Sequence, residues 1–173
     1  MIIVSACLLG ENCKYSGGNN KSENVIKYLE DKEYILVCPE QLGGLSTPRN
    51  PSEIITYGNK DGNDVLSGCT KVLSNKGIDV TKNFIQGAEE TLKIAKEHNA
   101  KTAILKAGSP SCGYKKIYDG TFLGNKIQGM GVTAAILNKE NIALLDEDDI
   151  WFISWVYISL KNLKKSRIWF NIE

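Results

Sequence analysis

Three cysteines of this 173-residue chain each follow a separate short apolar run that reads as a buried strand. Cys7 follows the run 2–6, Cys38 follows the run 34–37, and Cys112 lies six residues after the run 102–106. Ligands of open α/β sheets bind at the carboxyl ends of the strands, so we expect these thiols to converge on one site. Three thiolates without histidine suit a soft, sulfur-loving metal centre. An iron–sulfur cluster normally takes four thiolates, so three would leave one iron open to act as a Lewis acid.

Glu40 is the natural carboxylate at such a site, because it lies two residues after Cys38. Since it follows Pro39, we expect it in a loop, where it can serve as a base beside a metal-bound water. The alternative is a solvated loop glutamate.

Polar residues also surround Cys112. Ser109 and Ser111 flank Pro110, and their hydroxyls either hold polar groups of a substrate or make a turn. Lys106 ends the preceding apolar run and either stabilises negative charge or extends to solvent.

The remaining candidates point to ordinary roles. Cys13 lies in a glycine-rich loop from which it can approach the site, whereas Cys69 lies in a weakly structured stretch and is expected to be a bystander. His98, the single histidine, is expected at the end of a helix. No C-x-x-C occurs, which counts against zinc ribbons and thioredoxin-like sites. The glycine-rich nucleotide-binding motifs are absent too.

Composition narrows the class of protein. A chain with 42% hydrophobic and 24% charged residues is expected to fold as one domain. A net charge of +1 gives the chain no excess of positive charge with which to bind duplex nucleic acid. The longest apolar run, 150–160, is shorter than the roughly 20 residues of a membrane span. Five cysteines without a basic apolar leader argue against a disulfide framework, so we expect a cytoplasmic protein.

Strands alternate with helices, which predicts a single compact α/β domain with a mainly parallel, Rossmann-like sheet. Helices are expected over 21–31, 81–97 with Thr81 as N-cap, 132–137 and 147–165, and a last strand over 142–145. We expect short strands around turns over 54–80, with 71–74 pairing locally, and a long loop over 107–130. Residues 1–145 are assigned to the catalytic domain and 146–173 to an aromatic-rich helical extension packed on it. The acidic run 146–149 suits the start of that last helix.

Several of these segments together resemble the DUF523 family, whose characterised branch includes bacterial thiouracil desulfidase. The resemblance covers about residues 2–145 and rests on Val4-Ser-Ala-Cys-Leu-Leu-Gly10, Cys38-Pro-Glu40, Gly43-Gly-Leu45, Thr47-Pro-Arg49, Asp79-Val-Thr81 with Phe84 and Gly87-Ala88, Leu105-Lys106, Ser109-Pro-Ser-Cys-Gly113, Ile117-Tyr-Asp-Gly-Thr-Phe122 and Gly131-Val-Thr133. The combination of Ser-Pro-Ser-Cys-Gly with Cys-Pro-Glu is its most specific part.

The resemblance implies a [4Fe–4S] cluster held by Cys7, Cys38 and Cys112, with Cys13 left open as an alternative ligand near Cys7. It implies that the open iron takes the sulfur of a thiocarbonyl substrate such as 2-thiouracil, that water replaces the sulfur, and that hydrogen sulfide leaves without redox change. By position, Glu40 is assigned as the water-activating acid/base, and Ser109 or Ser111 as substrate-positioning groups.

Three other interpretations use the same features. The cysteines can serve a sulfur or cluster carrier without catalysis, or a zinc- or thiol-based protein that binds a small molecule. The chain can also be the partner of a larger desulfurising enzyme. The aromatic residues after position 150 then form a docking surface or a homodimer contact, or else part of the core; they are Trp151, Phe152, Trp155 and Ile158.

Overall fold

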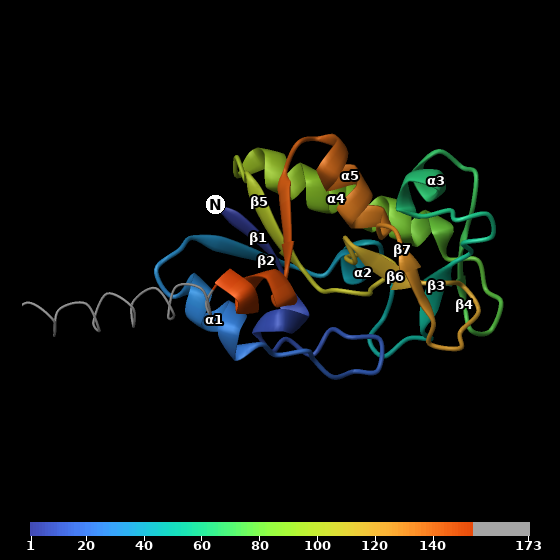
Figure 1. Cartoon of the computed structure of the whole chain (residues 1–173), viewed down its shortest axis with the longest axis horizontal. Coiled ribbons are helices and arrows are strands. Elements are labelled where there is room, and N and C mark those ends of the chain that lie inside the picture. The colour runs from blue at the N-terminus through green and yellow to red at the C-terminus, as the bar shows by residue number, and fades with distance from the viewer. Residues whose placement is uncertain (154–173) are drawn as a thin grey trace, which may run out of the picture.

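A computed structural model describes residues 1–153 of the protein and shows a four-stranded parallel sheet at its centre (Figure 1). The strand order is β2-β1-β5-β8, with β1 at Ile2–Ser5, β2 at Tyr34–Val37, β5 at Thr102–Leu105 and β8 at Ala143–Asp146. The chain leaves β1 toward β2 on one side and later returns to β5 on the other. This reversal creates a topological switch point between β1 and β5, where ligands bind in folds of this kind.

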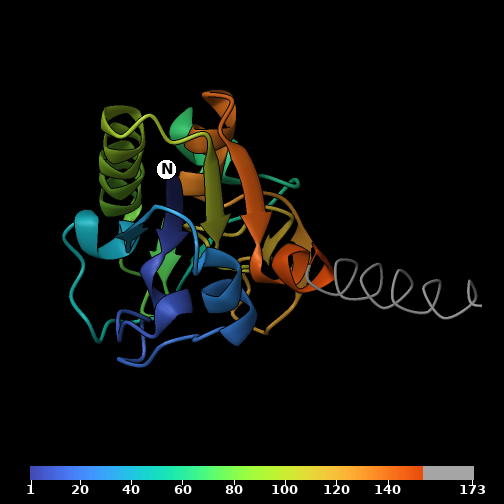
Figure 2. The ribbon, with the colours of Figure 1, turned by 90° about the vertical axis from the view of Figure 1, so that its left-hand side faces the viewer.

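Helices cover both faces of the sheet. Alternate residues of each strand face opposite sides, so the apolar strands contribute side chains to both layers. Ile3, Ala103 and Leu105 pack with residues of α4 (Thr81–Glu97) and α5 (Val132–Lys139). Val4 and Ile104 pack instead with α1 (Glu23–Leu29), the 3-10 turn η1 (Ala6–Leu9) and Ile150. The side view places α4 and the helix that starts at residue 147 on opposite sides of the strands (Figure 2).

A second group of elements extends the domain beyond the sheet. It contains two antiparallel two-stranded sheets, β3–β4 and β6–β7, and the helices α2 and α3. The bounds are α2 Pro39–Leu42, β3 Ser52–Ile54, α3 Gly62–Leu66, β4 Val72–Ser74, β6 Lys116–Tyr118 and β7 Lys126–Gln128. A separate apolar cluster around Phe84 and Ile117 joins the two small sheets and α3 to α4 and α5.

The predicted α/β architecture with a parallel sheet is confirmed, and so is the local pairing of 71–74, which forms β4 against β3. Three local predictions were wrong. The stretch 54–80 contains a helix, α3, whose N-terminus is capped by Asp61. The expected loop 107–130 contains the β6–β7 hairpin. Thr81 is the first residue of α4 rather than its N-cap, because Asp79 accepts the Thr81 N–H and the Thr81 hydroxyl donates to the same carboxylate.

The acidic run after β8 starts the last helix, as predicted. One oxygen of Asp146 accepts the N–H groups of Asp148 and Asp149, and Asp149 accepts the N–H of Asp146 in return. Most of the predicted 146–173 extension, including Trp155 and Ile158, lies outside the described residues. Within residues 1–153, no helix is long and apolar enough to cross a membrane.

Candidate active site

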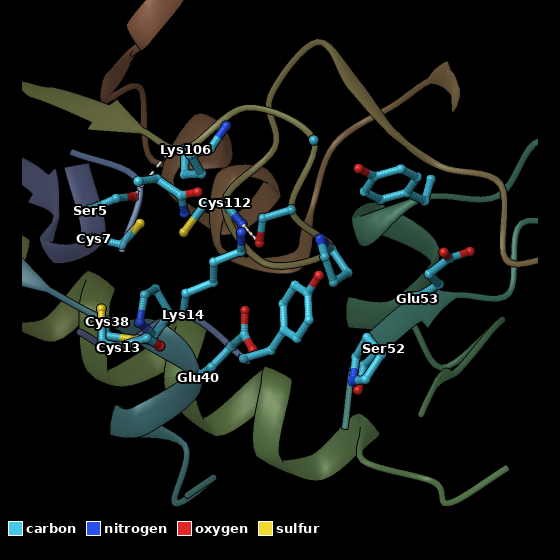
Figure 3. A pocket seen from close by; sticks show the side chains of 18 of the residues that line it. Ser5, Cys7, Cys13, Lys14, Cys38, Glu40, Ser52, Glu53, Lys106 and Cys112 are labelled. Atoms are coloured by element: carbon cyan, nitrogen blue, oxygen red, sulfur yellow. Dashed lines mark hydrogen bonds between the residues drawn. The ribbon is translucent and has the colours of Figure 1, made fainter. Parts of the chain in front are cut away.

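A cavity of about 510 Å³ opens at the carboxyl edge of the sheet, beside the switch point between β1 and β5. Four thiols lie at one end of it, and the predicted polar groups line it as well (Figure 3). The predicted site residues in its lining are Cys7, Cys13, Cys38, Glu40, Lys106, Ser109 and Cys112. The expectation that cysteines distant in sequence meet at one edge is therefore confirmed by the fold.

The end of β1 contributes Cys7 and a hydroxyl group that reaches β5. Cys7 lies in η1, two residues after Ser5. Ser5 is buried, and its Oγ accepts the N–H of Lys106 at 3.1 Å. Its hydroxyl also hydrogen-bonds to the thiol of Cys112. This single side chain therefore links two neighbouring strand ends and orients one thiol.

The end of β2 contributes Cys38, which is the N-cap residue of α2. Pro39 occupies the first turn of this helix, where its missing N–H has no cost. Helix α2 packs against α4 through two glycines, because a Cβ atom on Gly87 would lie 1.9 Å from the carbonyl oxygen of Pro39, and one on Gly43 would lie 1.9 Å from that of Asn83. Only hydrogen atoms fit between the two helices, so α4 fixes the position of Cys38.

The loop after β5 contributes Cys112. The Oγ of Ser109 accepts the N–H groups of Ser111 and Cys112, at 3.0 and 3.1 Å. The carbonyl oxygen of Ser111 accepts the N–H of Thr133 at 3.0 Å, which satisfies a donor of the first turn of α5. The Ser111 side chain is 1% exposed, and its Oγ lies 2.8 Å from the Thr133 hydroxyl. Ser109 therefore faces the cavity, whereas Ser111 anchors the loop to α5 and is not part of the cavity wall.

The four thiols differ in their electrostatic environments. A hydrogen bond from Cys13 lowers the pKa of Cys38 to about 6, with a further contribution from the N–H of Gln41, against the opposing effect of burial. A hydrogen bond from Cys13 also lowers the pKa of Cys7. The same bonds raise the pKa of Cys13 itself, the donor. Full burial raises the pKa of Cys112. Of the four thiols, Cys38 and Cys7 therefore lose a proton most readily, and the thiolate is the form in which cysteine binds metals.

Glu40 lies in the first turn of α2, so the expectation that it belongs to a loop was wrong. Its Oε2 accepts a hydrogen bond of 2.6 Å from the Nε of Arg49. The Nη2 of Arg49 donates to the carbonyl oxygen of Cys13 at 3.0 Å, and the Sγ of Cys38 lies 3.7 Å from the same oxygen. Arg49 therefore ties the carboxylate to the loop that carries Cys13.

Lys106 borders the cavity from the end of β5. Its Nζ forms an ion pair with Glu147 and donates to the carbonyl oxygen of Ala107 at 3.1 Å. The second oxygen of Glu147 accepts the N–H of Ala107 at 2.9 Å. These contacts join the start of the last helix to the end of β5. The Lys106 side chain therefore has a structural partner and does not simply extend to solvent.

The donor set fits an iron–sulfur cluster. All five cysteines are free thiols, and four of them line one cavity without histidine. Between residues 1 and 153, no three His, Cys, Asp or Glu side chains converge on the position of a single metal ion. Each thiolate ligand of a [4Fe–4S] cluster binds a different iron, so such a cluster does not require that convergence.

Sequence reasoning missed three residues of the site. Arg49 belongs to the Thr47-Pro-Arg49 motif, but its pairing with Glu40 depends on how the chain between the two residues folds. Ser5 and Asn20 resemble ordinary strand and loop residues in the sequence, although the Asn20 side chain hydrogen-bonds to Cys7. Cys69 is exposed and His98 is the C-cap of α4, both away from the cavity as predicted.

The fold and the site define an α/β protein with a thiol-rich cavity at the switch point of a parallel sheet. The chain belongs to the 2-thiouracil desulfurase family, whose model matches residues 2–149, and this confirms the family resemblance seen in the sequence. The chain is 47% identical over 150 residues to the uncharacterized protein YbbK of Bacillus subtilis (strain 168), covering 87% of this chain and 97% of that protein. It also resembles the solved structure of TudS, a [4Fe-4S]-dependent thiouracil desulfidase, with a TM-score of 0.75 and 37% identity over 92% of this chain and 97% of that one.

Proposed function

We propose that the protein is a [4Fe–4S]-dependent desulfidase that converts a thiocarbonyl compound such as 2-thiouracil into the corresponding carbonyl compound. One water is consumed and one hydrogen sulfide is released for each C=S bond replaced by C=O. The carbon keeps its oxidation state, so the reaction needs no electron donor. The observation that carries the proposal is the convergence of three strand-end thiols and Glu40 on one cavity.

Cys7, Cys38 and Cys112 are the residues proposed to hold the cluster. When bound, a cluster with three protein ligands supplies one open iron, a soft Lewis acid suited to the sulfur of the substrate. Cys13 is proposed as a neighbour that hydrogen-bonds to Cys7 and Cys38 and not as a ligand.

Glu40 is proposed to take a proton from the attacking water. Arg49 engages Oε2, and no hydrogen bond to Oε1 is found among residues 1–153, so that oxygen stays available to the cavity. The ion pair also holds the carboxylate in one orientation, which general base catalysis requires.

Ser109 is proposed to position the substrate. Its oxygen already accepts two backbone N–H groups, so the hydroxyl hydrogen is left to donate to a polar atom of the substrate. For Ser111 the hydrogen bond to Thr133 supports a different role, the anchoring of the loop that carries Cys112.

Anaerobic purification followed by quantification of iron, sulfide and turnover tests the proposal. We expect close to four irons and four sulfides per chain, and many equivalents of hydrogen sulfide released from 2-thiouracil. Release of at most one equivalent would instead identify a sulfur carrier. A colourless protein that contains zinc would contradict the cluster. We further propose a cytoplasmic location, supported by the five free thiols, and cell fractionation tests it.

A further inference from the structure

The turn between β6 and β7 places Phe122 in the wall of the cavity. The proposed cluster chemistry makes no use of this turn, although the run 117–122 is one of the motifs noted in the sequence. The backbone of Phe122 has a φ of 59°, in the left-handed region that a bulky residue rarely adopts. Such a conformation persists only where neighbouring contacts impose it, and it clusters at functional sites.

Contacts from β3 and the residues after it impose this conformation. Oε2 of Glu53 accepts the N–H of Phe122 at 3.1 Å. The hydroxyl of Thr56 donates to the carbonyl oxygen of Asp119. Gly120 packs so closely that a Cβ atom there would lie 2.6 Å from the carbonyl oxygen of Ile54. The turn is therefore fixed at several points before any ligand binds.

Glu53 is an unusual residue to hold a turn, because it is a carboxylate only 7% exposed. It forms no ion pair within the part of the chain that the structure describes. Burial raises its pKa, and the N–H groups of Phe122 and Gly120 oppose that effect. Figure 3 shows Glu53 across the cavity from the cysteines. A buried acid is thus used to fix one wall of the cavity opposite the thiols.

Phe122 differs from the other aromatic residues of the cavity. Nζ of Lys14 lies 5.5 Å from the ring centroid of Tyr15, and Nζ of Lys126 lies 5.2 Å from that of Tyr118. Over residues 1–153, no cation lies above the ring of Phe122. The Phe122 side chain is half-buried and belongs to the cavity lining, and aromatic rings bind heterocycles by stacking without base-specific hydrogen bonds.

We propose that the planar ring of the thiocarbonyl substrate stacks against Phe122, and that Glu53 is the positioning residue that holds Phe122 in place. Phe122 then selects flat heterocycles over aliphatic thioamides. The identity of the ligand rests on the proposed function, whereas the placement of the aromatic ring rests on the contacts above.

The test uses anaerobic holoprotein and two ligands, 2-thiouracil as substrate and uracil as its flat product. Phe122→Asn removes the ring but tolerates a left-handed backbone, and Phe122→Tyr keeps the ring. We expect Phe122→Asn to raise the KM for 2-thiouracil and the Kd for uracil at least about fivefold, which corresponds to the lower end of base–aromatic stacking. The kcat and the iron content should stay within about twofold. Phe122→Tyr should match the parent protein, and so should Leu123→Ala, a change at the exposed neighbouring residue.

Glu53 is tested by rescue. Glu53→Ala should raise the same KM and Kd, whereas Glu53→Gln, which keeps an oxygen acceptor for the N–H of Phe122, should restore both to within about twofold. Unchanged KM and Kd in Phe122→Asn would overturn the proposal, even if Glu53→Ala fails to fold. A lower iron content with unchanged KM in Glu53→Ala would overturn the role of Glu53. If the parent protein binds uracil through Phe122 but releases no sulfide, the proposed function fails and the stacking site stands.

Discussion

The Nε of Arg49 lies 2.6 Å from Oε2 of Glu40, and the two side chains are only 8% and 18% exposed. The same guanidinium donates to the carbonyl oxygen of Cys13, and the Cys13 thiol hydrogen-bonds to Cys7 and Cys38. One cation thus connects the proposed acid/base to the thiol end of the cavity. A lysine cannot make both contacts in the same geometry, because it lacks the planar fork of arginine.

Replacing the proposed acid/base should separate catalysis from cluster binding. We expect Glu40→Gln to lower kcat about 100-fold or more, the usual contribution of general acid–base catalysis, with the iron content unchanged. Steady-state kinetics on 2-thiouracil measures the change. Glu89→Gln, at an exposed position on α4, is the control. A Glu40→Gln variant with normal kcat would remove Glu40 from the mechanism.

Removing Arg49 should instead reduce stability. Arg49→Met leaves the Glu40 carboxylate largely buried without its partner, a change that costs about 3 kcal/mol or more. Chemical denaturation of the cluster-free protein gives the free energy of unfolding. If Arg49→Met is as stable as the parent, the ion pair contributes nothing to the fold. The double variant Arg49→Met with Glu40→Gln should recover part of the loss, since no charge is then left unpaired.

Substitution should distinguish the three cysteines proposed to hold the cluster from the exposed cysteine. Ser replacements at Cys7, Cys38 or Cys112 should each lower the iron content to less than half and abolish multiple turnover. Cys69→Ser, at the exposed cysteine, should behave like the parent. Iron assays and visible absorption of anaerobic samples provide the measurement. Full iron in any of the three ligand variants, or loss of iron in Cys69→Ser, would contradict the assignment.

Thiol reactivity of the cluster-free protein should follow the electrostatic environments of the cysteines. The pKa of Cys38 is about 6, so its thiolate fraction, and with it the rate of alkylation, should rise as pH increases through 6. Cys112 should react more slowly at every pH below 8, because burial raises its pKa and restricts access. Peptide mass spectrometry after timed iodoacetamide treatment distinguishes the two. Equal rates at pH 7 would contradict the prediction.

The contact between α2 and α4 should be intolerant of a single methyl group. Gly87→Ala places a Cβ atom 1.9 Å from the carbonyl oxygen of Pro39, so α2 must move. We expect a loss of roughly 1–3 kcal/mol, the cost of overpacking, despite the better helix propensity of alanine. Denaturant titration of Gly87→Ala against Gln86→Ala, a change at the exposed preceding residue, provides the comparison. Iron content should fall with it, because α2 carries Cys38.

Much of the site was readable from the sequence because it depends on strand ends. Cys7, Cys38 and Cys112 follow short apolar runs, and the carboxyl ends of parallel strands meet wherever such a sheet forms. The roles of Ser111 and Arg49 were not readable. Ser111 is buried and hydrogen-bonds to Thr133, which lies 22 positions further along the chain. Arg49 pairs with Glu40, which lies nine positions before it. Such pairings depend on tertiary geometry and leave no local pattern.

Local structure between the strands was predicted less well, for reasons visible in single residues. Pro39 suggested a loop around Glu40, yet proline is favourable in a first helical turn. The β6–β7 hairpin was missed because its strands have three residues each, too few to show an alternating pattern.

The three thiols proposed to hold the cluster come from the segments that follow three different strands, so the lengths of chain between them carry no chemical constraint. Insertions or deletions in the intervening surface segments would leave the positions of the sulfur atoms unchanged, as long as β1, β2 and β5 keep their order. Distant proteins with this chemistry are therefore better found by aligning the residues immediately after each strand than by any fixed interval between cysteines.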